Sequence, residues 1–178
     1  MNEILEFTYR PKTEAKRIVP ILVTLIVISA VLVVLSVTAP LYKGLIILAA
    51  VAGITASMYF FLRYAAGDFV YSVTFDSVGQ AVFTVVKVVG KRSSTMCYLH
   101  LSNFKSVEKM KSADYKKSKK DYKAQRFNFC PSFAPESFYM IKSESRGMRT
   151  EVIVDVTEEV AVRLMEYAQI AKDTEPEE

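Results

Sequence analysis

The chain has 178 residues, of which 51% are hydrophobic, and its mean hydropathy of +0.20 is unusually high for a water-soluble protein of this size. The formal net charge is only +4, and from Asp68 onward 17 Lys and Arg residues stand beside 16 Asp and Glu residues. This balance argues against the charge excess of a nucleic-acid-binding protein.

Two long uncharged runs account for the apolar composition. They cover Ile18–Thr38 and Gly44–Leu62, and only residues 39–43 separate them. An α-helix rises about 1.5 Å per residue, so each run is about 30 Å long as a helix, which is the thickness of the hydrocarbon core of a bilayer. The sequence therefore predicts a transmembrane hairpin over residues 18–64.

A cleaved signal peptide is the alternative for the first run. The small residues at 36–39 resemble a cleavage site, but Pro40 would follow the cut. The run is also longer than the apolar region of a typical signal peptide, and a second run follows at once. These features favour an uncleaved hairpin.

The basic residues around the two runs predict their orientation. Lys43 lies in the connecting turn and Arg63 follows the second run. Four basic residues precede the first run: Arg10, Lys12, Lys16 and Arg17. The positive-inside rule then predicts a multi-pass protein of the cell membrane with both termini in the cytoplasm. Free thiols at Cys97 and Cys130 fit a reducing compartment, whereas a disulfide between them would require the opposite orientation.

Small residues recur along the second run. Ala49, Gly53 and Ser57 are spaced by four residues and so share one helical face, which lets another helix approach closely. That helix is either the other half of the hairpin or a helix of a second protein chain. Neither run contains Asp, Glu, His or Arg, which argues against a channel or transporter.

From residue 69 the pattern changes to strand-like alternation of apolar and polar residues. Seven segments follow this pattern: 69–75, 80–89, 95–101, 105–109, 124–130, 137–143 and 150–156. Gly79 lies in the first turn, where a positive φ is expected. Lys111–Lys123 lacks strand character and is expected to be a solvated loop.

The last segment has helical periodicity. Thr157 is a plausible N-cap, followed by acidic residues in the first turn. One apolar stripe is expected to pack against the strands: Val160, Leu164, Tyr167, Ala168 and Ala171. The sequence thus predicts a mainly β domain, a bent antiparallel sheet or partly open barrel of seven strands capped by this helix. Residues 173–178 form an acidic tail.

This order of elements resembles that of a pleckstrin-homology-like (PH-like) domain. The stretch from Tyr98 to Glu108, YLHLSNFKSVE, is similar to the family's transition from a third to a fourth strand. The resemblance is closest to small bacterial PH-like proteins in which two membrane helices precede the domain. It implies a cytoplasmic N-terminal segment at residues 1–17, then the hairpin, and a cytoplasmic PH-like domain at 66–172.

No catalytic pattern accompanies these elements. His100 lacks a nearby Ser, Cys or Asp at a motif spacing, and the sequence has no glycine-rich phosphate loop, GxSxG or HExxH motif. With one histidine and no CxxC motif, the usual metal ligands are lacking as well. We therefore expect a protein that is not an enzyme and that uses no cofactor or metal.

The lysine-rich stretch is the one candidate binding site. Five lysines carry the hypothesis: Lys116, Lys117, Lys119, Lys120 and Lys123. A lysine run is often only a solvated surface, but in an antiparallel meander this loop would return towards the membrane. There the lysines could bind anionic lipid headgroups, with Tyr115 and Tyr122 at the interface.

Two functions therefore fit the sequence. The first is a membrane-anchored scaffold that binds a protein partner, a second copy of itself or anionic lipids. The second is an accessory subunit of a larger membrane complex, for transport, secretion or envelope assembly, that packs through the hairpin. Nucleic-acid binding is not expected, because no aromatic and basic strand motif accompanies the lysines.

Overall fold

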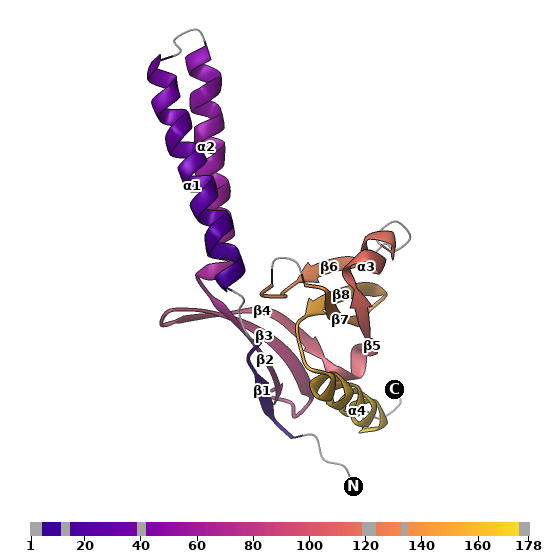
Figure 1. The fold of residues 1–178 in the computed structure, drawn as a ribbon. Coiled ribbons are helices and arrows are strands. Elements are labelled where there is room, and N and C mark those ends of the chain that lie inside the picture. The colour runs from indigo at the N-terminus through magenta and orange to yellow at the C-terminus, as the bar shows by residue number, and fades with distance from the viewer. Residues whose placement is uncertain (1–4, 12–14, 39–41, 119–123, 133–134, 175–178) are drawn as a thin grey trace. The chain divides into compact units, whose positions relative to one another are not determined.

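The computed structural model describes residues 5–11, 15–38, 42–118, 124–132 and 135–174 (Figure 1). The chain divides into two compact units. Residues 13–67 form the first, called the hairpin here, and residues 1–12 together with 68–178 form the second, called the β-domain.

The hairpin consists of two apolar helices, α1 (Ala15–Thr38) and α2 (Lys43–Phe60), and a π-helical turn, η2 (Phe61–Ala65), continues α2. Both helices are long and apolar enough to cross a membrane. The buried residues of α1 are spaced by four or seven, as in packed antiparallel helices: Ile18, Leu22, Ser29 and Ser36. Only 17% and 11% of the most apolar windows are buried, so most apolar side chains point away from the protein.

Sheet A of the β-domain contains β1 (Phe7–Tyr9), β2 (Asp68–Phe75), β3 (Ala81–Val89) and β4 (Arg92–His100) in this order. All neighbours are antiparallel. Tyr9 pairs with Tyr71, so the strand before the hairpin lies beside the strand after it. Gly79 has a φ of 84° in the turn between β2 and β3, as predicted.

Sheet B contains β5 (Phe104–Lys111), β6 (Gln125–Asn128), β7 (Ser137–Ser145) and β8 (Met148–Val154). Its spatial order is β5-β7-β8-β6, and β6 is parallel to β8. A short 3-10 helix, η3 (Leu101–Asn103), connects the two sheets along the chain, and α3 (Ser112–Ser118) follows β5.

The core lies between the two sheets and α4 (Glu158–Thr174). Strand alternation places Tyr71, Phe83 and Ile141 in this core. The predicted helical stripe also packs there, with Leu164, Tyr167, Ala168 and Ala171 buried. The Tyr71 hydroxyl donates a hydrogen bond to the Phe129 carbonyl at 2.9 Å and accepts one from the Asp155 amide at 3.3 Å, which ties sheet A to segments next to β6 and α4.

The expected single sheet of seven strands is wrong, because the described residues form eight strands in two sheets of four. β1 was not predicted, since a strand of three residues is too short to show alternation. The expectation of a loop over Lys111–Lys123 is wrong for residues 112–118, which form α3. The parallel pair of β6 and β8 also shows that sheet B is not a meander.

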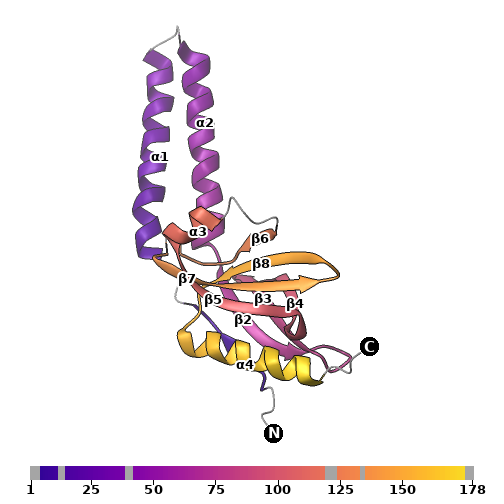
Figure 2. The same ribbon diagram turned by 90° about the vertical axis from the view of Figure 1, so that its right-hand side faces the viewer.

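α3 and α4 lie at opposite ends of the β-domain, as both views show (Figures 1 and 2). The strand directions agree with this placement. The start of β2 at Asp68 pairs with Val88, whereas its end at Phe75 pairs with Ala81 near the end of β4. The chain therefore comes in from the hairpin at one end of sheet A, and η3 with α4 lies towards the other end.

Candidate functional site

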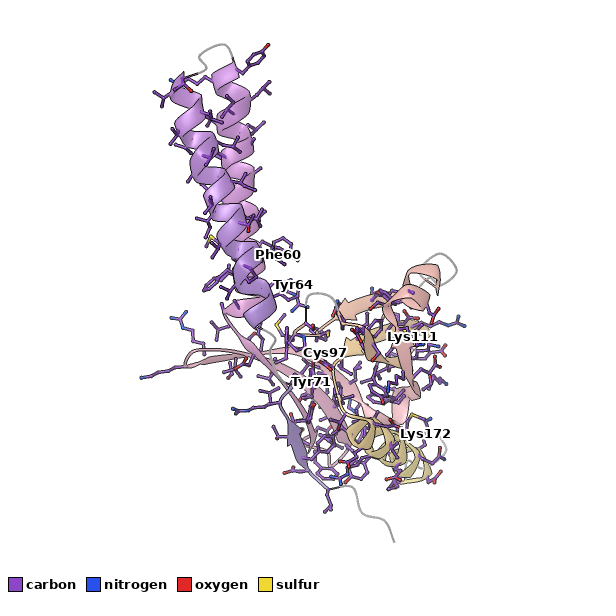
Figure 3. All side chains as sticks on the ribbon, viewed as in Figure 1. Phe60, Tyr64, Tyr71, Cys97, Lys111 and Lys172 are labelled. Atoms are coloured by element: carbon purple, nitrogen blue, oxygen red, sulfur yellow. The ribbon has the colours of Figure 1, made fainter. Side chains whose placement is uncertain are left out.

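The predicted lysine cluster falls partly on α3. Lys116 and Lys117 belong to this helix, while Lys119, Lys120 and Lys123 lie outside the described residues. Lys111, the last residue of β5, is exposed and lies beside the start of α3 (Figure 3). Both views also place α3 at the end of the β-domain where β2 begins.

α3 is attached to sheet B through Tyr115. The Tyr115 ring packs edge-on against Phe138 with 5.4 Å between ring centroids, and the Arg126 guanidinium lies 5.2 Å from the Tyr115 ring. The Ser112 hydroxyl also donates a hydrogen bond to the Pro135 carbonyl. Tyr115 therefore belongs to a small cluster on sheet B, and its predicted place at a membrane interface stays a prediction. Tyr122 lies outside the described residues.

A buried ion pair supports the other end of the lysine-rich segment. The Arg126 guanidinium lies 2.5 Å from the Glu151 carboxylate, and their side chains are only 12% and 3% exposed. These residues sit opposite each other on β6 and β8. Because Arg126 also contacts Tyr115, the residues just before and just after the lysines are held together. Sequence reasoning missed this pair, since its partners are distant in the chain.

Further cations lie on sheet A, in the tight turn between β3 and β4. Lys91 and Arg92 are exposed there, beside the first residue of β2. The sequence shows them only as ordinary turn residues. Their position became apparent only from the strand register.

The structure places the three small residues of α2 differently from one another. An added side chain at Gly53 would collide with Ser29 of α1, and Ser57 is buried. Ala49 is exposed, whereas Ala50 is buried instead. Two of the three residues thus face the neighbouring half of the hairpin, and Ala49 faces outward.

The thiols and phenols inside the β-domain are poorly suited to act as nucleophiles. Figure 3 shows Cys97 and Tyr71 inside the β-domain. Burial raises the pKa of the Cys97 thiol to about 11 and raises the pKa of the Tyr71 phenol well above its usual value. Cys130 is fully buried in the small cluster on sheet B. His100 packs edge-on against Tyr98 at the end of β4.

Hollows occur on each of the two units. One, of about 340 Å³, lies on the hairpin and has a mainly apolar lining that includes Ile26, Ile54 and Phe61. The other, of about 360 Å³, lies between α4 and sheet B, with Lys109 and Glu158 at its rim 4.0 Å apart. No group of three or more potential metal ligands occurs in the described part of the chain.

Comparison with known proteins gives one family. Residues 3–171 match the family described as "Bacterial PH-like domain (DUF6106)". No curated protein and no solved structure matches the chain. The family match includes both apolar helices as well as nearly all of the β-domain. The chain therefore belongs to the bacterial PH-like domain family.

Proposed function

We propose that this protein is a non-enzymatic binding module that its hairpin anchors in the cell membrane, with the PH-like β-domain on the cytoplasmic side. The pairing of β1 with β2 is the observation that carries this proposal. Because these strands precede and follow the hairpin, both ends of the chain must be on the same side of any membrane that the hairpin crosses.

The surface of the hairpin supports the membrane anchor. The helices expose large apolar side chains along their length, such as Val34, Leu48 and Met58, which are 62–66% exposed. A core helix of a soluble protein would bury such residues. Two spans with outward apolar side chains fit lipid instead. The basic residues around the two apolar runs support a cytoplasmic position for this side.

The ligand that we propose for this module is the anionic surface of the inner leaflet. The five lysines at 116, 117, 119, 120 and 123 are contained in a short segment whose flanking residues, Tyr115 and Arg126, contact each other. Each cation close to an anionic membrane contributes about 1 kcal/mol of attraction. α3 lies at the end of the β-domain where β2 begins, and β2 follows the hairpin directly in the chain.

A topology experiment tests the anchor. Epitopes are fused to the two termini of the full-length chain, and protease is added to sealed inside-out and right-side-out vesicles. Both epitopes should be cleaved in inside-out vesicles and protected in right-side-out vesicles. Cleavage of the two epitopes from opposite sides would contradict the proposal.

Hydrogen exchange tests the lipid contact. We expect amides of α3 in the full-length protein to exchange more slowly in nanodiscs with anionic lipid than in zwitterionic nanodiscs. Alanine at the five lysines should abolish this difference. The matched control replaces five basic residues elsewhere with alanine: Lys105, Lys109, Arg149, Arg163 and Lys172. Equal exchange in both nanodiscs, or loss of the difference in the control alone, would refute lipid binding by the lysines.

An accessory subunit is the second function to test. The outward position of Ala49 leaves the small residue available to a helix of another protein. A stoichiometric membrane partner that co-purifies in mild detergent, and that dissociates when Ala49 is replaced by Leu, would favour this function.

A further inference from the structure

The turn between β3 and β4 combines an apolar tip with cations. Val89 is 42% exposed, and Lys91 and Arg92, which follow it closely, are exposed as well. Because Val88 pairs with Asp68, this turn lies directly beside the first residue of β2. It therefore lies at the end of sheet A where the chain arrives from the hairpin.

Chain connectivity limits the distance between this turn and the end of the apolar helices. The second candidate span ends at Ala65, and β2 begins three residues later at Asp68. Three residues extend at most about 11 Å and paired strands are about 5 Å apart, so the backbone of Val88 lies within about 16 Å of Ala65. The headgroup layer on one side of a bilayer is about 5 to 8 Å thick. The connection is thus short enough for the turn to reach the headgroups of a membrane that the hairpin crosses.

The local charge fits an anionic surface. From residue 77 to residue 107 the chain contains no Asp or Glu. The same stretch contains four basic residues: Lys87, Lys91, Arg92 and Lys105. Asp68 is the acidic residue that the strand register places beside the turn. An apolar side chain flanked by cations is suited to the boundary between anionic headgroups and acyl chains.

We propose that the β3–β4 turn is a second membrane contact of this protein. Lys91 and Arg92 bind anionic lipid headgroups, and the Val89 side chain inserts at the interface. The contact rests on the proposed function, because it requires the hairpin to be in the bilayer. It does not depend on the five lysines at 116–123, which lie between β5 and β6 in the chain.

A single tryptophan provides the test, because the chain contains none. Val89→Trp is placed in the full-length protein, which is reconstituted in anionic nanodiscs with lipids whose brominated chains quench tryptophan. Val78→Trp is the matched control, since Val78 is 80% exposed in the turn between β2 and β3 at the opposite end of sheet A. We expect at least twofold stronger quenching for V89W than for V78W.

The same V89W variant tests the contribution of Lys91 and Arg92. Lys91→Glu with Arg92→Glu should reduce the quenching of V89W to the level of V78W, because each cation removed lowers the ratio of docked to free turn about fivefold. Quenching of V89W that is no stronger than that of V78W, or that survives both charge reversals, overturns the contact. Extraction of the wild-type chain from membranes by alkaline carbonate would instead refute the membrane anchor and this contact together.

Discussion

The ion pair between Arg126 and Glu151 allows a quantitative test of how β6 is held in place. β6 has four residues and joins sheet B at its edge, through parallel pairing with β8. Arg126→Met removes the guanidinium but keeps a long apolar side chain. It leaves the Glu151 carboxylate, in a side chain only 3% exposed, without the charge that lies 2.5 Å away in the wild type.

The expected loss is large for a domain of this size. Removing one partner of a buried ion pair costs about 3–5 kcal/mol, because the other charge stays buried. Loss of the cation from the Tyr115 ring adds about 0.5–1 kcal/mol. The total is a substantial part of the roughly 5–15 kcal/mol that stabilises a typical domain, and it lowers Tm by at least about 10 °C.

The double variant separates the charge from the packing. Arg126→Met with Glu151→Met removes both charges together, so we expect it to recover at least about 2 kcal/mol relative to R126M. Thermal unfolding of the full-length protein in detergent measures each variant. Lys105→Met is the control, because its ammonium lies 4.0 Å from Glu144 in an exposed pair that contributes about 0–1 kcal/mol. If R126M is no less stable than K105M, or no less stable than the double variant, the ion pair does not hold β6.

Two further predictions concern the hairpin and the pH dependence of stability. Gly53→Leu should lower the thermal stability of the hairpin in detergent, because its side chain meets Ser29, while the outward Ala49→Leu should change it by less than about 0.5 kcal/mol; equal effects would contradict the packing. The Lys142 ammonium holds the pKa of the Glu108 carboxyl below its usual range, so their pair stabilises the fold above about pH 5 and this stability is lost as pH falls through the lowered pKa. Lys142→Met should therefore be less stable than the wild type at pH 7 by at most about 1 kcal/mol, and this difference should shrink as the pH falls through the lowered pKa of Glu108; a difference that grows in acid would argue against this linkage.

Local patterns predicted most elements of the β-domain but not their partners. Alternation in segments such as residues 69–75 and 137–143 depends only on one buried face, and those strands are confirmed. Which strands pair is decided by contacts far apart in the chain, so the division into two sheets and the parallel position of β6 were not visible. α3 was missed because its seven residues, SADYKKS, lack an apolar stripe, and its attachment depends largely on Tyr115.

The sequence also predicted the packing of the two hairpin helices only in part. A spacing of four residues suggested that Ala49, Gly53 and Ser57 share one face. Packed antiparallel helices instead meet along rows spaced alternately by four and three residues, and this alternation selects Ala50 in place of Ala49. The cations of the β3–β4 turn were overlooked for a different reason, because only the register of β2 with β3 shows that this turn lies near the first residue of β2.

The position of β1 in the chain also determines when sheet A can form during translation. Residues 7–9 leave the ribosome before either apolar helix, while the strand that pairs with them is translated after both. Sheet A therefore gains its first strand only once the hairpin has been made and its two ends have been brought together. In the proposed topology, the nascent N-terminus stays on the cytoplasmic side of the membrane until β2 has been translated.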